Sequence, residues 1–450
     1  MQSRMRPNTD SLHRFSRRLV LTALLAATAC GLTACTDAED ENYLWLLGLA
    51  NPAAAAGEAS GESETVPFTI DVSDINGEPD FLFETTQTVD LFISVVDPVA
   101  PVSGSRVRVF ELINGSTGEQ TLFQAVSDPN GNVQGSFTVN RTTSTVVLEY
   151  NFAGQTYRQE VDITSVQSIR RTLNVFATVG PEQIADADGD GIPDEDDAYP
   201  EDPTRATIVR FPSDGGVYTV AFEDLYPRQG DADFNDYVLA LSYEADLTAA
   251  GDVPSLRGEY THRARGAGYR HELRLTLAGF TDAELVLERF AADATGPDAV
   301  PEFERRETLP QFEGVTMLPA SNTTIARSNT RRGQSYAVGK RARFAVPPAT
   351  PVPLAALGSM PFDLHLIVLN TGHEIHFLGR YFEDDGSDRY LDRAGFPWAL
   401  LLPGDWRWPL ERQDIRPAYP LFQDWYASGG EINPEWYASA IDDYVVDLLE

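Results

Sequence analysis

The chain has 450 residues, with 34 Lys and Arg against 68 Asp and Glu, and a formal net charge of −34. A surface this negative repels nucleic acid and anionic lipid headgroups, which excludes nucleic acid as a partner. Only Cys30 and Cys35 are present. The predicted mature chain therefore contains no disulfide, and its stability must come from core burial and, we expect, from bound metal.

The first 35 residues have the organisation of a lipoprotein signal peptide. Five arginines precede an apolar run from Leu19 to Ala34, and Leu32-Thr33-Ala34-Cys35 forms a lipobox whose cysteine thiol takes the lipid. The run is shorter than the ~20 residues that span a bilayer, so an uncleaved transmembrane anchor is the weaker interpretation. Ser16-Arg17-Arg18-Leu19 leaves twin-arginine export open. Because Thr36 and not aspartate follows Cys35, we predict a signal peptide over 1–34 and a lipid-anchored (palmitate-bearing) protein in the outer membrane of a Gram-negative bacterium.

Two segments follow the lipobox. Residues 35–65 are rich in small and acidic residues, which predicts a flexible tether. Residues 66–180 contain alternating apolar and polar segments separated by tight-turn sequences, which predicts an antiparallel β-sandwich of immunoglobulin or transthyretin-like type. The clearest strands are expected at residues 89–96, 106–110, 135–139 and 145–150.

Residues 181–204 form a strongly acidic linker. Side-chain oxygens recur at positions 1, 3, 5, 9 and 12 of a loop, with a glycine at position 6 and a backbone carbonyl expected at position 7; these are Asp186, Asp188, Asp190, Asp194, Asp197, Gly191 and Ile192. Calcium takes about 6–8 oxygen ligands, and this spacing wraps a short loop around one ion. No amphipathic helix flanks the loop, so it is closer to the thrombospondin type 3 kind than to an EF-hand sensor. The alternative is an acidic disordered linker.

Residues 205–450 again predict strands, which makes the whole chain all-β with a larger C-terminal sandwich. The expected strands are residues 206–211, 217–222, 237–243, 271–277 and 362–369. A little helix is expected near the C-terminus, over Ala418–Tyr426 and Glu435–Leu449, where Trp436, Tyr437, Ile441, Tyr444, Val445 and Leu448 form an amphipathic stripe.

A further acidic segment lies at Phe222-Glu-Asp-Leu…Asp231-x-Asp-Phe-Asn-Asp236. Together with the Asp-rich loop and later motifs it resembles the LruC-domain lipoproteins of bacteria; the later motifs are Phe396-Pro-Trp-Ala399, Trp408-Pro-Leu-Glu411, Ala418-Tyr-Pro-Leu-Phe422 and Glu435-Trp-Tyr437. The resemblance spans residues 66–450 and implies a lipobox, an N-terminal β domain, a calcium-type loop and a C-terminal domain, but no known activity. Residues 293–350 carry no family motif and are interpreted as an insertion.

The same segment has a chemistry of its own. Six oxygen-bearing side chains occur in fourteen positions, at Glu223, Asp224, Asp231, Asp233, Asn235 and Asp236. We expect apolar anchors at Phe222, Leu225, Phe234 and Val238 to present them together at one end of a sheet, as a second calcium site. The alternatives are turn capping around Gly230 and a general acid–base pair.

Histidines and tryptophans allow two further interpretations. His373 and His376 are three apart, not four as in a zinc-protease helix, and a strand would place them on opposite faces. With His365 they leave a transition-metal site open. Trp398, Trp406, Trp408 and Trp425 fit either a sugar platform or a core.

These observations favour a non-enzymatic, calcium-stabilised envelope lipoprotein with Ca²⁺ as its cofactor. Its expected partners are the bilayer, through acylated Cys35, and an unidentified surface protein or glycan. A purely structural spacer without a ligand is a second hypothesis. A hydrolase of glycans or peptides that uses Glu223, the Asp231–Asp236 carboxylates or the His373/His376 pair is the third.

Overall fold

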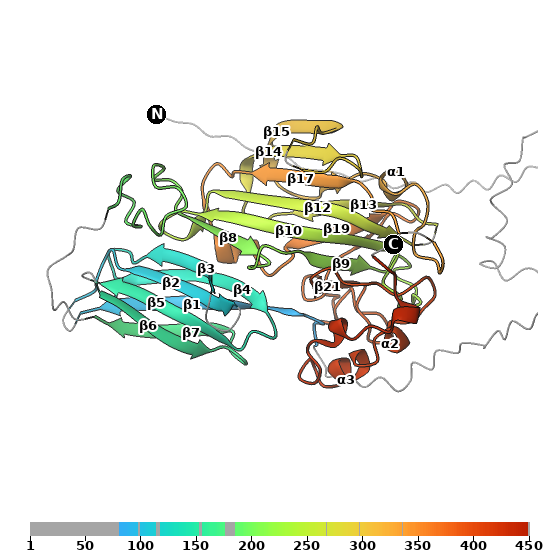
Figure 1. Cartoon of the computed structure of the whole chain (residues 1–450), viewed down its shortest axis with the longest axis horizontal. Helices are drawn as coiled ribbons and strands as arrows, with labels where there is room; N and C mark the ends of the chain where they lie inside the picture. Colours follow the sequence, from blue (N-terminus) through green and yellow to red (C-terminus); the bar gives the residue numbers. More distant parts are fainter. Residues whose placement is uncertain are drawn as a thin grey trace, which may run out of the picture. The chain divides into compact units, whose positions relative to one another are not determined.

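The computed structural model describes residues 81–97, 100–113, 118–152, 155–175, 185–266, 268–296, 298–334 and 336–448. The described residues are almost entirely strands and their connections, which confirms the predicted all-β class (Figure 1). The predicted signal peptide, Cys35 and the tether lie outside the described residues. Within the described ranges, no helix combines the length and the apolar character that a membrane span requires.

The first seven strands form two sheets that pack as a sandwich. The sheets have the orders β4-β1-β7 and β3-β2-β5-β6, with β1 Thr86–Val96, β2 Arg106–Ile113, β3 Gly118–Val126, β4 Asn132–Asn140, β5 Thr145–Phe152, β6 Gln155–Asp162 and β7 Ser168–Asn174. Alternate residues of β1, such as Val89, Leu91 and Ile93, are buried, because successive side chains of a strand point to opposite faces. One pairing differs from the predicted antiparallel sandwich: β1 and β7 run parallel.

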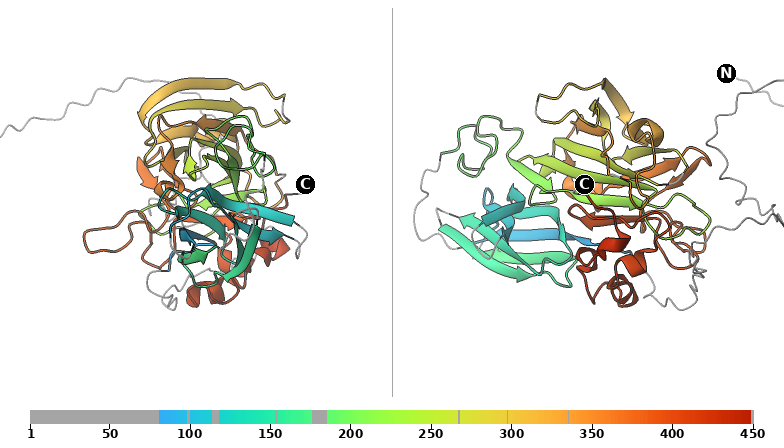
Figure 2. Two further views of the ribbon diagram at one scale, coloured as in Figure 1. Left: turned by 90° about the vertical axis from the view of Figure 1, so that its left-hand side faces the viewer. Right: turned by 45° about the vertical axis from the view of Figure 1, so that its right-hand side comes forward.

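A second group of strands builds one large sheet in the order β15-β14-β17-β12-β10-β9-β21, with β8 also paired to β10. The curved outer strands β14 and β15 are seen best in Figure 2. The bounds are β8 Thr207–Phe211, β9 Tyr218–Phe222, β10 Tyr237–Leu247, β12 Ser255–Arg265, β14 Thr281–Phe290, β15 Phe303–Gln311, β17 Arg341–Val346 and β21 Ala399–Pro403. The 11-residue strand β10 is central and almost wholly buried, as its apolar run requires.

A four-stranded sheet of order β16-β13-β19-β20 packs against this large sheet, and a short pair β11-β18 lies beside them. Their bounds are β11 Asp252–Val253, β13 His271–Thr276, β16 Val315–Leu318, β18 Val352–Pro353, β19 Asp363–Val368 and β20 His373–Ile375. Contacts such as the ring pair Tyr243–Phe362, 5.0 Å between centroids, join the layers. The interpretation of residues 293–350 as an insertion is wrong, since β17 lies inside the large sheet between β12 and β14.

The C-terminal region is mostly loop, with short helices packed around an aromatic cluster. The described helical turns are α1 Ser321–Thr324, η3 Leu354–Leu357, α2 Ile415–Ala418, α3 Phe422–Ala427, η4 Trp436–Ala438 and η5 Asp442–Tyr444. The predicted helix over Glu435–Leu449 is therefore wrong: two single turns replace it, because Trp436 packs edge-on against Phe422 and Tyr419 and Val445 pairs with Pro409. The helix expected over Ala418–Tyr426 is shortened to α3.

Candidate metal centres

The Asp186–Asp197 loop is a helix-free turn structure, as predicted. Residues 185–206 contain turns and bends but no helix. Gly189 and Gly191 have φ angles of +77° and +98°, which residues with a Cβ rarely adopt. These two glycines reverse the chain so that the carboxylates of Asp186, Asp188 and Asp190 each bring an oxygen within 4.8 Å of the others.

Carboxylate oxygens of the loop accept hydrogen bonds from its own backbone: Asp186 uses both of its oxygens, and each of the others uses one. Asp186 accepts hydrogen bonds from the backbone N–H groups of Gly189 and Gly191, at 2.8 and 3.1 Å. Asp190 accepts from Ile192 and Asp194 from Ala187, at 2.8 and 2.7 Å. The loop is thus shaped by the residues that the spacing singles out.

In three of these residues, the second carboxylate oxygen accepts no hydrogen bond from the loop. Oδ2 of Asp188, of Asp190 and of Asp197 is buried and has no hydrogen-bond partner within the described part of the chain. A buried polar atom without a partner costs about 1–3 kcal/mol, more when it is charged. These oxygens come from positions 3, 5 and 12, which are ligand positions of a calcium loop.

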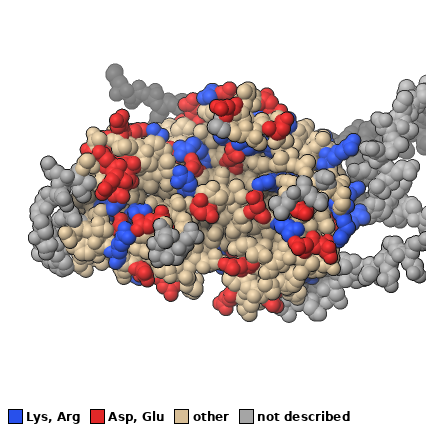
Figure 3. Space-filling model, viewed as in Figure 1, with Lys and Arg blue, Asp and Glu red and all other residues tan. Residues whose placement is uncertain are grey.

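The pKa values of the loop carboxyls also indicate a site that needs a counter-charge. Burial, together with the neighbouring carboxylates of Asp190, Asp188 and Asp186, raises the pKa of Asp197 to about 6, although the hydrogen bond from the Tyr199 amide lowers it. Burial also raises the pKa of Asp190. Acidic side chains gather in this part of the molecule in the space-filling view (Figure 3). The loop is therefore strained by like charge unless a proton or a cation neutralises it.

The loop is attached to both neighbouring sheets. Asp196 forms an ion pair of 2.5 Å with Arg106 on β2, and its carbonyl accepts a hydrogen bond from Gln124 on β3. Ile192 is buried, and the hydroxyl of Tyr199 donates to Asp246 on β10 at 2.7 Å. Any ion that orders this loop would therefore also order its contacts with β2, β3 and β10.

The second acidic segment lies at the connection between β9 and β10, at one end of the large sheet, as predicted. Glu223 follows β9 directly and Asp236 precedes β10 directly. Five of the six predicted side chains are buried, namely Glu223, Asp224, Asp233, Asn235 and Asp236, while Asp231 is half-buried. Of the four predicted anchors, Phe222, Phe234 and Val238 are fully buried, whereas Leu225 is only partly buried. We call these six residues the acidic cluster.

Part of the acidic cluster caps turns. Glu223 Oε1 accepts from the Phe234 amide at 2.5 Å, and Asp236 Oδ2 accepts from the Asp224 amide at 3.0 Å. Asp233 accepts from the backbone N–H groups of Asn235 and Arg412. Turn capping therefore accounts for one side-chain oxygen in each of several residues of the acidic cluster. It does not account for the remaining oxygens.

The oxygens left over are Glu223 Oε2 and Asn235 Oδ1, which are buried and without a hydrogen-bond partner among the described residues. Carboxylate oxygens of Glu223, Asp231 and Asp233 lie within 4.8 Å of one another. The cavity beside Glu223 has a volume of ≈ 20 Å³, room for about one water molecule or ion and not for a sugar or peptide.

Glycine keeps this space open. A Cβ at Gly230 would overlap Glu223 Oε2, and a Cβ at Gly266 would lie 2.6 Å from Asn235 Oδ1. The backbone is also unusual, since Ala232 and Phe234 have φ angles of 55° and 48°. Such left-handed conformations at residues with a side chain concentrate at functional sites.

Charge repulsion in the acidic cluster is strong. Burial raises the pKa of Glu223, Asp233 and Asp236 well above the ordinary range, and the other carboxyls of the cluster raise these pKa values further. Five carboxyl groups this close cannot all be ionised in a buried site without a counter-charge. The arrangement suits either shared protons or a bound cation.

A Ser–His–Asp line of hydrogen bonds supports the acidic cluster, and no motif in the sequence pointed to it. Asp224 Oδ2 lies 2.9 Å from His271 Nε2, and His271 Nδ1 lies 3.1 Å from Ser321 Oγ. All three residues are buried, with Ser321 fully inaccessible. A nucleophile must reach its substrate, so this line holds Asp224 in place and does not have the access of a catalytic triad.

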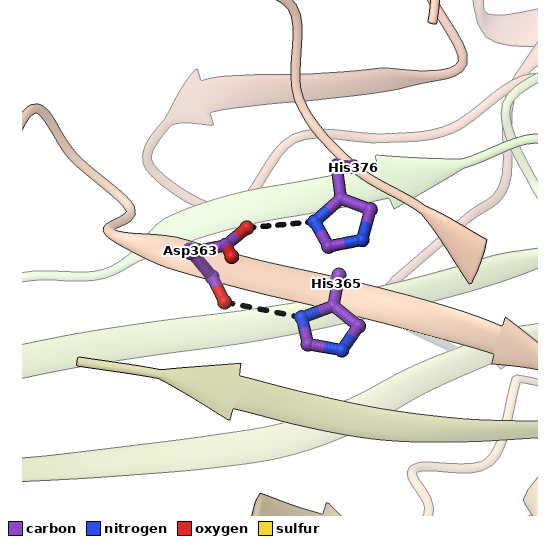
Figure 4. Close-up of side chains that lie close together, drawn as sticks. All are labelled: Asp363, His365 and His376. Carbon is purple, nitrogen blue, oxygen red and sulfur yellow. Dashed lines mark hydrogen bonds and ion pairs between the residues drawn. The ribbon is translucent and has the colours of Figure 1, made fainter. Parts of the chain in front are cut away.

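The structure separates the histidines as the strand reading predicts: His373 is exposed and His376 is buried. His376 instead meets His365, whose ring stacks on it at 4.3 Å, and Asp363 (Figure 4). The tryptophans Trp398, Trp406, Trp408 and Trp425 are all buried, so they form core and not a sugar platform.

Comparisons with known proteins add family context. Residues 251–437 match a domain of unknown function, DUF4842; this span includes the motifs from Phe396 onward and excludes both acidic segments. A crystal structure of a "putative lipoprotein" from Bacteroides ovatus is similar with a TM-score of 0.45 and 15% sequence identity, over 76% of this chain and 98% of that chain. That similarity is too low to transfer a function. No curated protein matches the chain.

Proposed function

We propose that the chain is a non-enzymatic envelope lipoprotein, anchored through acylated Cys35, whose folded part is stabilised by Ca²⁺ at the Asp186–Asp197 loop and at the acidic cluster. The observation that carries this proposal is the set of three buried, unpartnered carboxylate oxygens on Asp188, Asp190 and Asp197. They come from residues whose other oxygens already shape the loop, so they remain available to an ion.

Calcium fits this donor set better than other common ions. The available ligands are all oxygens, which suits a hard cation, and calcium tolerates irregular geometry where magnesium demands an octahedron. In the loop, the candidates are side-chain oxygens of Asp186, Asp188, Asp190, Asp194 and Asp197 with the carbonyl of Ile192. In the acidic cluster, Glu223 Oε2 and Asn235 Oδ1 join Asp231, Asp233 and neighbouring carboxylates.

The consequence of binding would be mechanical. An ion would neutralise the loop and fix Asp196 against Arg106 on β2 and Tyr199 against Asp246 on β10. Since a ligand that binds only the folded state adds to its stability, calcium would stiffen the connection between the seven-stranded sandwich and the large sheet. Affinity on the order of 10⁻⁴–10⁻³ M, as in extracellular modules, would suffice outside a cell.

Support for a binding or structural role over hydrolysis comes from access. The cavity beside Glu223, at ≈ 20 Å³, holds an ion and not a glycan or peptide. The partner we propose is accordingly a surface protein or glycan that docks elsewhere on the folded part, with the bilayer reached only through the lipid.

Thermal unfolding of the protein in millimolar calcium and in chelator tests the proposal. We expect a large rise in Tm with calcium, and a smaller rise in an Asp188→Ala/Asp190→Ala variant that lacks two loop ligands. Asp384→Asn, an exposed acid far along the chain, is the matched control and should behave as the wild type. Equal Tm values in calcium and chelator for the wild type would contradict the proposal.

A further inference from the structure

Two buried histidines lie face to face on the four-stranded sheet. His365 is on β19, and His376 follows β20 directly. Because Leu366 pairs with Ile375 in the antiparallel register, one further step along both chains sets His365 opposite His376. Their rings stack with centroids 4.3 Å apart and an interplanar angle of 18°. Both side chains are about 3% exposed.

Asp363 fixes which nitrogen of each ring carries the proton. His376 Nδ1 lies 2.7 Å from the Asp363 carboxylate, and His365 Nδ1 lies 3.2 Å from the Asp363 carbonyl. Both oxygens can only accept, so each Nδ1 is the donor and each Nε2 carries a lone pair. The other carboxylate oxygen of Asp363 accepts from the Tyr381 hydroxyl at 2.8 Å, which immobilises the group.

The two Nε2 atoms point to the same side, away from Asp363 (Figure 4). Neither has a hydrogen-bond partner among the residues that the structure describes. The carboxylate of Glu374 stands on that side, with Oε2 3.6 Å from His376 Nε2 and a side chain that is 53% exposed. Two imidazole nitrogens thus lie on the same side as one carboxylate, and the side chain that carries the carboxylate reaches solvent.

We propose that His365 Nε2, His376 Nε2 and Glu374 bind one divalent transition-metal ion, with Zn²⁺ as the best-suited species. Two histidines and a glutamate form a known type of zinc donor set that leaves a coordination position for solvent. Imidazole ligands select Zn²⁺ and similar ions over Ca²⁺, which prefers the all-oxygen sites described above. This site is therefore separate from the calcium sites and does not depend on them.

Two further features suit a metal site. Metal-bound histidines usually donate their other N–H to a carboxylate or carbonyl, and Asp363 supplies both kinds of acceptor. Both residues are also buried, and the hydrogen bonds of both Nδ1 atoms to Asp363 leave Nε2 as the ligand atom of each ring. A tetrahedral zinc with bonds of about 2.0–2.1 Å would hold its nitrogens roughly 3.3 Å apart with converging lone pairs, so both rings must rotate out of their near-parallel stack when the ion binds.

Calorimetric titration of the full chain with ZnCl₂ tests this proposal, in detergent and with millimolar calcium present so that the oxygen sites are filled. We expect one Zn²⁺ per chain. His365→Gln and His376→Gln should each weaken binding at least about 100-fold, and Asp363→Asn, which only orients a ligand, by about 10–100-fold. Substitution of Co²⁺ should give the visible absorption of a four- or five-coordinate nitrogen–oxygen site, and Zn²⁺ should abolish it.

Controls keep the test decisive. His373→Gln changes an exposed histidine three residues from His376 and should bind Zn²⁺ as the wild type does. Glu374→Gln alters an exposed side chain that the fold does not need, so its expected tenfold or greater loss of affinity decides the matter even if a buried histidine variant fails to fold. Absence of Zn²⁺ binding in the wild type, or unchanged binding in Glu374→Gln and His365→Gln, would overturn the proposal.

Discussion

Gly266→Ala should remove the calcium ion from the acidic cluster. A Cβ at this position would lie 2.6 Å from Asn235 Oδ1, 2.8 Å from Asp236 Oδ1 and 2.8 Å from Asp236 Cα, whereas ordinary contact begins at 3.4 Å. Each atom would have to move by roughly 0.6–0.8 Å, which exceeds the deviation of about 0.2 Å that metal–ligand distances show from their usual values. One of the three atoms belongs to the backbone, so a side-chain rotation cannot relieve the overlap.

The size of the effect follows from the cost of overpacking. Insertion of a methyl group into a packed site costs about 1–3 kcal/mol, which corresponds to about a 5- to 150-fold weaker Kd if the cost falls on the bound state. The assay is calorimetric titration with CaCl₂ in an Asp188→Asn/Asp190→Asn background, where only the acidic cluster binds. Gly118→Ala is the matched control, because its Cβ would meet its nearest neighbour at 3.8 Å. An unchanged Kd in Gly266→Ala would refute the assignment of an ion to this cluster.

Three further predictions concern pH and the contacts of the loop. In chelator, the Tm should fall as pH rises from about 4 through about 6. The pKa of Asp197 in the folded protein, about 6, lies above its ordinary value of 3.8, so the folded state is stabilised by the protonated carboxyl and loses that stability as the proton leaves. A flat Tm over this range would contradict the burial of Asp197. Calcium binding at the acidic cluster should release protons, because burial raises the pKa values of Glu223, Asp233 and Asp236 and a bound cation favours their ionised forms. Titrations in buffers of different ionisation enthalpy measure this release, and heats independent of buffer would count against it. Arg106→Met should lower the free energy of unfolding by about 1–3 kcal/mol, because buried Glu149 loses its 2.9 Å partner but keeps its ion pair with Arg158. Arg306→Met, at an exposed ion pair, should cost under about 1 kcal/mol in the same denaturant titration.

Local patterns were enough to predict most strands. The alternation in residues 89–96 and the apolar run in residues 237–243 lie within β1 and β10, because burial of one or both faces imposes those periods. The spacing of the Asp186–Asp197 loop also predicted its turn structure, since each carboxylate caps an amide two to seven residues away. Elements that are determined by residues close together in the sequence can therefore be predicted from it.

Pairings between distant segments could not be predicted in this way. β9 pairs with β21 about 180 residues later, and β17, within a stretch that has no motif, fills the centre of the large sheet. The amphipathic stripe after Glu435 predicted a helix, but packing of Trp436 among other aromatic rings overrides that propensity. His365 and His376 lie near each other in the sequence, but the stacking of their rings could not be predicted because it depends on the register between β19 and β20.

The calcium content of the purified protein is the most direct test of the central claim. At equilibrium dialysis against calcium at several millimolar, atomic absorption should find an excess of two Ca²⁺ per chain on the protein side for the wild type and of one for the Asp188→Asn/Asp190→Asn variant. No excess calcium with the wild type, or the same excess with both proteins, would contradict the account that an ion completes the loop between the two groups of sheets.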